Sequence, residues 1–288
     1  MCIYNNIHRD VVTLCAGKED DKVSLELKEL VAIEFKRNGL FYLDKIGEVF
    51  ELYADLLVSE NKKYNLTSII NPQDIVDKHF VDSILGFEKF KEKNPKTLPL
   101  VVMDIGTGAG FPGIPLILYD QICNEGKLIK EIHLVDSNKK KTEFLCLVGD
   151  ILAKSLGKKL FTVHNNRLET LDLVGDSPDL FLSRATGNIS RVIEHLAEFL
   201  VKNGQILNDS SLLYYGGLNV QRLKEGYELN SKTDSGHRVQ FNVSMEIIAE
   251  FEFSIQNYKR INIMFKCASI IIFIGTLLLY VQEKRTIR

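Results

Sequence analysis

The segment from Val101 to Gly113 constrains the fold of this chain more than any other stretch. A short apolar run leads there into three glycines at alternate positions, Gly106, Gly108 and Gly110, and an apolar helical pattern follows. Glycines at such a turn allow the main chain to approach a ligand at the N-terminal end of a helix. The segment therefore predicts a strand–loop–helix unit with a ligand at its turn.

The chain beyond this unit repeats the alternation of short apolar runs and helical patterns. Strands are expected at residues 98–103, 132–135, 160–163, 180–182 and 205–207, and helices after residue 113 and at residues 137–156 and 189–201. Such alternation is typical of parallel strand–helix–strand units in a doubly wound sheet, so we predict an α/β fold. Runs at residues 246–253 and 260–266 indicate a closing hairpin.

Helical periodicity precedes the first strand. We expect helices at residues 24–39 and 42–61, and a third that opens at Asn71 and Pro72, a capping residue followed by proline at the first helical position. The predicted organisation is a loose extension (1–23), a helical cap (24–95), the main α/β domain (96–266) and an apolar C-terminal tail (267–288).

The apolar C-terminal stretch allows two interpretations. As one helix, residues 261–281 would be about 31 Å long at ~1.5 Å per residue, which is enough to span a bilayer. If residues 261–266 instead form the last strand of the sheet, residues 267–281 alone are too short to span. We favour the strand, since its loss would expose a sheet edge. We therefore expect a cytoplasmic protein, with membrane contact of the tail as the disfavoured alternative.

Composition limits the function less than the motifs do. The 36 basic and 38 acidic residues give a net charge of -2, so any contact with RNA must come from local basic clusters. The five cysteines are scattered and form no C-x-x-C pair, which suits a reducing compartment. We expect no metal site.

Two aspartates flank the glycine-rich loop. Asp104 ends the first strand and Asp136 ends the second. Residues 108–113 fit G-x-G-x-x-G, so a dinucleotide is an open alternative. A carboxylate at Asp104, however, would repel a pyrophosphate and attract the ammonium group of S-adenosylmethionine. Asp136 would accept hydrogen bonds from a ribose in either case. The alternative is that both aspartates only cap strand ends and helices.

Several motifs then occur in an order that resembles one family. They are Tyr64–Ser68 (YNLTS), His79–Ser83 (HFVDS), Asp104–Leu116 (DIGTGAGFPGIPL), Val135–Ser137 with Lys139–Lys141, Arg167–Glu169 and Ser183–Ala185. The set resembles the RsmG/GidB family of bacterial methyltransferases that act on guanine N7 in small-subunit (16S) ribosomal RNA. The resemblance covers residues 24–204, and extends more loosely to residue 266.

The resemblance implies a fold, a cofactor and a set of site residues. The fold would be a Rossmann-like class I S-adenosylmethionine methyltransferase, with a seven-stranded, mostly parallel sheet and an N-terminal helical cap. The cofactor-binding residues would be Gly106, Phe111, Asp136, Leu168, Glu169 and Arg184. His79 and Asp82 match an H-x-x-D-S signature, for which a structural hydrogen bond and a direct functional role are both open.

The implied reaction needs no general base. Guanine N7 carries a lone pair and no proton, so in-line alignment with the sulfonium methyl group is the main requirement, and we assign no catalytic residue. Among the site residues, Arg184 is the best candidate for a role beyond cofactor binding.

The implied partner is small-subunit ribosomal RNA or the ribosomal subunit, and we expect no stable protein partner. RNA contacts are expected from Lys62, Lys63, Lys139, Lys140 and Lys141, and less strongly from Lys154, Lys158 and Lys159, whose charges are more often a solvated helix end.

One departure from the family concerns RNA affinity. Family members carry a Lys-Gly pair after the fifth strand, whereas Leu212–Gly217 here read LLYYGG after an apparent insertion at residues 208–211. A tyrosine cannot supply the charge of that lysine. An NAD-type oxidoreductase and a non-catalytic relative that binds S-adenosylmethionine or RNA are the alternative functions.

Overall fold

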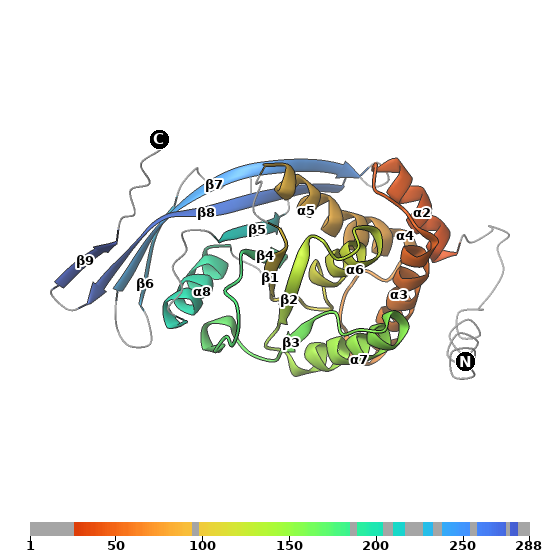
Figure 1. Cartoon of the computed structure of the whole chain (residues 1–288), viewed down its shortest axis with the longest axis horizontal. Coiled ribbons are helices and arrows are strands. Elements are labelled where there is room, and N and C mark those ends of the chain that lie inside the picture. Colours follow the sequence, from red (N-terminus) through yellow and green to blue (C-terminus); the bar gives the residue numbers. More distant parts are fainter. Residues whose placement is uncertain are drawn as a thin grey trace.

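Five parallel strands form the centre of the computed structural model, which describes residues 26–93, 98–184, 189–203, 210–216, 227–232, 238–253, 258–274 and 277–281. Their order in the sheet is β3 (Thr162–His164), β2 (Ile129–Val135), β1 (Leu100–Ile105), β4 (Leu180–Arg184) and β5 (Ser211–Gly216) (Figure 1). The chain leaves β1 toward β2 and later returns to its other side with β4. This reversal leaves a crevice at the carboxyl ends of the strands, where ligands bind in such sheets.

Antiparallel strands extend the sheet beyond β5. They follow in the order β8 (Tyr258–Ile274), β7 (Arg238–Phe253) and β6 (Tyr227–Lys232), and β9 (Leu277–Val281) pairs with β8. The α/β class with a parallel sheet is confirmed. The expected count of seven strands is wrong, because five strands are parallel and the antiparallel ones bring the described sheet to nine.

The expected closing hairpin is present and is longer than predicted. β7 and β8 pair from Phe253↔Tyr258 outward to Arg238↔Phe273, and β9 pairs with the far end of β8. Residues 267–274 therefore continue β8, which crosses the boundary that we placed before residue 267. Their β-branched run satisfies its backbone groups in the ladder. No helix among the described residues is both long and apolar enough to cross a membrane.

Helices cover the two faces of the parallel strands unequally. One face carries the helices of the cap region and of the first two crossovers, and the other carries α8 (Ile189–Lys202) and the 3-10 turn η2 (Leu168–Thr170) (Figure 1). The first group comprises α2 (Leu27–Arg37), α3 (Asp44–Tyr64), α4 (Pro72–Ile75), the π-helical η1 (Val76–Val81), α5 (Asp82–Lys93), α6 (Gly113–Cys123) and α7 (Lys139–Leu156). Successive side chains of β1 point to opposite faces, so Val102 joins one apolar cluster and Met103 the other.

The helix boundaries follow from local chemistry. The side chain of Asn71 accepts hydrogen bonds from the backbone N–H groups of Gln73 and Asp74, as the predicted cap requires. α2 begins at Leu27, where Glu26 and Glu29 form a capping box, and residue 24, where we expected this helix to begin, lies outside the described residues. The predicted helix at residues 42–61 continues to Tyr64.

The fifth strand lies later in the chain than expected. Residues 205–207, which we predicted as this strand, lie outside the described residues, whereas β5 pairs with β4 from Leu180↔Ser211 to Arg184↔Tyr215. All six residues of β5 are buried, as in a strand covered on both faces. The LLYYG segment is thus the strand itself. Our interpretation of it as a segment that follows the strand after an insertion was wrong.

Two C-terminal deletions should differ in their effect on folding. The pairing of β5 with β8 involves only Ile261–Lys266 of β8, so removal of residues 268–288 keeps that ladder, whereas removal of residues 258–288 exposes the edge of β5. We expect the shorter deletion to retain a cooperative thermal transition and the longer one to aggregate or unfold, as measured by circular dichroism and light scattering. Loss of the cooperative transition in the shorter variant would contradict this expectation.

Candidate functional site

The glycine-rich loop turns at the carboxyl end of β1. The backbone N–H groups of Gly106 and Thr107 both donate to the carbonyl of Val135, at 2.8 and 3.1 Å, which ties the loop to the end of β2. Gly106 and Gly110 have φ values of 65° and 104°, which residues with a side chain rarely adopt. A Cβ atom at Gly110 would also lie 2.7 Å from the hydroxyl oxygen of Tyr53. Both positions therefore require glycine.

Asp104 is fully buried beneath this loop and holds it to the next helix. Its Oδ2 accepts hydrogen bonds from the hydroxyl of Thr107 at 2.7 Å and from the backbone N–H of Gly113 at 2.8 Å. Its other oxygen, Oδ1, is buried and has no hydrogen-bond partner among the described residues. Burial raises the pKa of Asp104 to about 7, against the opposing effect of the hydrogen bonds and of Arg184. An orphaned buried oxygen of this kind favours a ligand that brings a donor or a positive charge.

Asp136 links the loop to the start of α7. Its Oδ2 accepts from the backbone N–H of Gly108 at 2.9 Å, and its Oδ1 accepts from that of Asn138 at 2.8 Å. This is the capping role that the sequence left open. Each carboxylate oxygen has a second lone pair, so both retain capacity for a hydroxyl donor. The Nζ of Lys141 lies 3.8 Å from Oδ2.

Arg184 ends β4 and is buried against the helical cap. Its Nη1 donates to Asp82 Oδ2 at 3.2 Å and to Ser83 Oγ at 3.4 Å, and its Nη2 hydrogen-bonds to Nδ1 of His79. The guanidinium carbon also lies 5.6 Å from the ring centroid of Phe111. The H-x-x-D-S segment and Arg184, which are far apart in the sequence, therefore form one polar cluster.

Phe111 packs between the loop and the cap. Its ring stacks on that of His79, with the centroids 4.0 Å apart and the planes 9° from parallel, and it contacts Tyr53 at 5.4 Å between centroids. These contacts leave the side chain buried. A contact of Phe111 with a cofactor stays a prediction.

Leu168 and Glu169 lie on η2, after β3. Leu168 is buried in the apolar cluster beneath α8, and Glu169 Oε2 lies 3.4 Å from Nδ1 of His195 without hydrogen-bond geometry. The side chain of Asn165 donates to the carbonyl of Asp136 at 3.2 Å, which joins the segment after β3 to the segment after β2. All six expected site residues are thus on segments that meet at one end of the sheet.

Tyr53 is a site residue that we did not predict. Its hydroxyl, on α3, donates to the carbonyl of Ala109 in the loop at 2.5 Å, and burial raises its pKa well above the ordinary value. In the sequence it is one of several apolar positions of an amphipathic helix. The available signal was chemical, since a buried tyrosine hydroxyl needs a hydrogen-bond partner.

The described residues contain no group of three or more histidine, cysteine or acidic side chains that could hold a metal ion. What the site offers instead is a glycine-rich loop, one buried carboxylate with a spare oxygen, a second carboxylate at its rim and a buried arginine. Such a set suits an organic ligand that carries hydroxyl groups and a positive charge.

Comparison with known proteins gives a consistent match. The model of the family described as "GidB: rRNA small subunit methyltransferase G" matches residues 46–222. Curated relatives named "Ribosomal RNA small subunit methyltransferase G" include one from Mesoplasma florum, 36% identical over 57% of this chain and 61% of the relative. Another, from Clostridium botulinum strain Alaska E43, is 37% identical over 56% of this chain and 62% of the relative. The chain thus spans about three fifths of the length of these relatives.

Solved structures show a weaker similarity. An S-adenosylmethionine-dependent methyltransferase from Clostridium acetobutylicum is 12% identical, with a TM-score of 0.37 over 78% of this chain and 79% of the other.

Replacing Tyr53 with phenylalanine should destabilise the protein. The substitution leaves the buried carbonyl of Ala109 without its donor, which costs about 1–3 kcal/mol in the free energy of unfolding. Urea denaturation measures this difference. The matched control is Tyr64→Phe at the end of the same helix, where the side chain is partly exposed and the effect should stay within about 0.5 kcal/mol. Equal effects of the two substitutions would show that the Tyr53 hydrogen bond contributes no more to the free energy of unfolding than a partly exposed tyrosine hydroxyl does.

Proposed function

The chain belongs to the rRNA small subunit methyltransferase G family, and we propose that it transfers a methyl group from S-adenosylmethionine to N7 of a guanine in small-subunit (16S) ribosomal RNA. The main support for the proposal is the buried Asp104 beside the glycine-rich loop. Its Oδ1 has no hydrogen-bond partner among the described residues. The cellular location that follows is the cytoplasm, where ribosomal subunits are assembled.

The residues of the loop fit S-adenosylmethionine better than a dinucleotide. A dinucleotide places its pyrophosphate on the free N–H groups at the N-terminal end of the helix after β1. Here the N–H of Gly113 donates to Asp104, and that of Ile114 donates to the carbonyl of Gly110. A carboxylate therefore occupies the place of the phosphate, which argues against the NAD-type oxidoreductase.

Four segments of the chain, at or after the ends of β1, β2, β3 and β4, would share the cofactor. Asp104 offers a buried negative oxygen to a positively charged donor, and Asp136 offers its remaining lone pairs to ribose hydroxyls. Gly106 lets the backbone approach the ligand. Leu168 and Glu169 would flank the adenine, and Arg184 would line the site from β4.

The reaction requires the protein to orient the methyl donor and the guanine, and it requires no proton transfer. S-adenosylmethionine supplies an electrophilic methyl group when bound, and guanine N7 already holds its lone pair. Alignment of the reacting groups contributes on the order of 7–11 kcal/mol in well-oriented reactions. Asp104, Asp136 and Arg184 are suited to that task, because hydrogen bonds hold their side chains in place.

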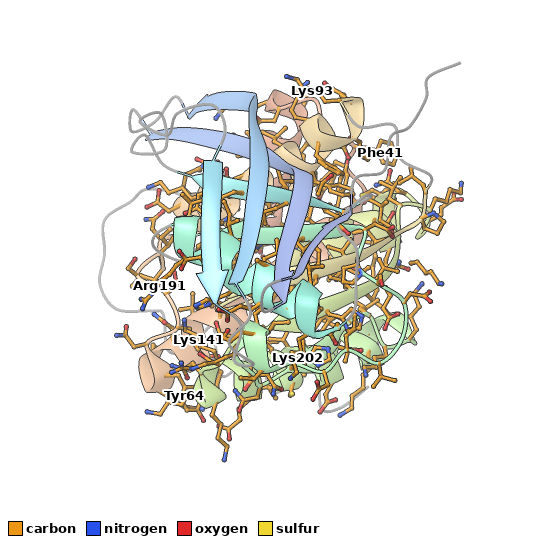
Figure 2. All side chains as sticks on the ribbon, turned by 90° about the vertical axis from the view of Figure 1, so that its left-hand side faces the viewer. Phe41, Tyr64, Lys93, Lys141, Arg191 and Lys202 are labelled. Atoms are coloured by element: carbon orange, nitrogen blue, oxygen red, sulfur yellow. The ribbon has the colours of Figure 1, made fainter. Side chains whose placement is uncertain are left out.

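The RNA face would lie where α3 ends and α7 begins. Figure 2 shows Tyr64 and Lys141 near the same lower edge of the molecule, away from Phe41 and Lys93. Lys62, Lys63, Lys139 and Lys140 are exposed on these two helix ends. Lys154, Lys158 and Lys159 lie at or beyond the far end of α7, more than about 20 Å along its axis, so we leave them out of the interface.

Methyl transfer to small subunits that lack the modification is the direct test. We expect incorporation from S-adenosylmethionine into 16S RNA, with the methyl group mapped to N7 of a guanine. S-adenosylmethionine and not NAD should raise the melting temperature. Binding without transfer to free RNA or to subunits would support the non-catalytic alternative, and stabilisation by NAD alone would overturn the proposal.

Affinity for S-adenosylmethionine should rise as the pH rises through about 7. The pKa of Asp104 is about 7 in the ligand-free protein, so below this pH the carboxyl is mostly protonated. A cationic ligand prefers the ionised form, and its binding therefore releases a proton on the acid side. We expect affinity to increase by up to about tenfold per pH unit below the pKa and to level off above it.

Calorimetry in two buffers of different ionisation enthalpy measures this proton release. The control is Asp104→Asn, which keeps the side-chain size but removes the titration, and which should bind weakly at every pH. A wild-type affinity that is constant from mildly acidic to mildly basic pH would refute the assigned contact.

The three lysines at the start of α7 should separate into two functions. Lys141 lies 3.8 Å from Asp136, whereas Lys139 lies 3.8 Å from Glu143 on the exposed side of the helix. Lys141→Ala should weaken S-adenosylmethionine binding by about twofold to fivefold, the range for a partly exposed ion pair. The double variant Lys139→Ala/Lys140→Ala should leave cofactor binding unchanged but lower RNA affinity and its salt dependence. If RNA affinity depends on salt concentration equally in this variant and in the wild type, neither lysine contacts RNA.

A further inference from the structure

We propose that His79, Asp82 and Ser83 form a cradle that positions the guanidinium of Arg184, and that His79 does so as a neutral imidazole with its proton on Nε2. The cradle rests on the proposed function in so far as Arg184 lines the cofactor site. Its members are positioning residues, because each contacts Arg184 from the side of the helical cap.

The tautomer follows from the donors and acceptors around the imidazole ring. A guanidinium has only donors, so the nitrogen of His79 that faces Arg184, Nδ1, must be an acceptor. The proton of the neutral ring is then on Nε2, which lies 3.3 Å from Thr67 Oγ1. An imidazolium has no acceptor nitrogen, and would also place a second positive charge against Arg184.

Thr67 is itself held in place to receive this proton. Its Oγ1 also accepts from the backbone N–H of Ile69 at 3.1 Å, and its own backbone N–H and carbonyl bond to the side chain of Asn61 at 2.9 Å each. The chain of bonds thus runs from Arg184 through His79 to the end of α3. The segment at Tyr64–Ser68 thereby has a structural role, because its Thr67 holds the imidazole of His79.

The backbone of the cradle is fixed from two directions. The π-helical turn η1 ends with the N–H of Asp82 donating to the carbonyl of Asp77, and such turns often occur at functional sites. The hydroxyl of Ser83 donates to the carbonyl of His79, and that of Tyr215 on β5 donates to the carbonyl of Ser83 at 2.8 Å. A buried ion pair needs such additional hydrogen bonds to be held in one geometry.

The position of Arg184 matters to the cofactor site through its charge. Arg184 lowers the pKa of Asp104 against the larger effect of burial, so a displaced guanidinium would leave that carboxylate less ionised. The cradle therefore keeps a positive charge at a fixed place from which it acts on the carboxylate of Asp104.

Nitrogen-15 NMR of the histidine rings in the full-length wild-type protein tests the tautomer directly. The chain has six histidines, and the His79 signals are assigned as those lost in His79→Asn. We expect a neutral ring with the proton on Nε2 at neutral pH. A neutral ring protonated on Nδ1, or an imidazolium, would overturn the proposal whatever the variants do.

A matched pair of substitutions tests the positioning role. The amide oxygen of His79→Asn reaches the place of Nδ1, whereas that of His79→Gln reaches the place of Nε2, and both lose the stacking on Phe111 to the same extent. We expect His79→Gln to lose on the order of tenfold more affinity for S-adenosylmethionine than His79→Asn, the scale of one hydrogen bond to a charged group. Melting temperatures of the two should be similar.

Equal affinity losses in the two folded variants would overturn the cradle. Failure of the cradle and failure of the proposed function can be told apart. A wild-type protein that binds S-adenosylmethionine but methylates no ribosomal RNA would refute the function. The affinities of His79→Asn and His79→Gln for S-adenosylmethionine could still be compared in that case. If neither variant folds, the NMR measurement on the wild-type protein decides, with the His79 signals assigned from their contacts with the stacked Phe111 ring.

Discussion

The buried carboxylate of Asp104 is the interaction on which the site depends. It accepts from Thr107 in the loop and from Gly113 at the start of α6, so it sets the path of the chain between β1 and its helix. The close packing at Gly113, where a Cβ would lie 2.8 Å from Asp104 Oδ2, follows from the same contact. Burial raises the pKa of this carboxyl, because removing a charge from water costs free energy. The oxygen that the fold does not satisfy is the one left for a ligand.

The site forms where the helical cap meets the sheet. Tyr53 from α3 bonds to the loop, and His79 stacks on Phe111 while it contacts Arg184 from β4. The cap therefore does more than shield the sheet from solvent. It supplies the hydrogen bonds and ring contacts that hold the loop and the arginine, and removal of either partner would leave polar groups buried without their bonds.

Local sequence patterns were sufficient for the elements whose signal is local. The glycine-rich loop, β1 to β4, the crossover helices and the cap at Asn71 were predictable because each is specified by neighbouring residues. β5 was placed wrongly because residues 205–207 and Leu212–Tyr215 are both apolar runs, and only pairing with β4 and β8 distinguishes them. The extension of β8 through Ile274 has the same cause, since its apolar run also fits a helix until β7 and β9 are known. The partner of Asp82 was hidden for a similar reason, because Arg184 lies 102 residues away.

The hydrogen bond between Tyr53 and Ala109 also has a consequence for how the chain is made. α3 leaves the ribosome before any strand of the sheet, and its buried face, which includes Phe50, Tyr53 and Leu57, has by then only other cap residues to pack on. Synthesis of about 50 more residues takes several seconds at 5–20 residues per second, and the apolar face stays open to chaperones or to aggregation for that time. The Tyr53 hydroxyl finds its partner only after the loop has been synthesised, so the helical cap completes its folding together with the first part of the sheet.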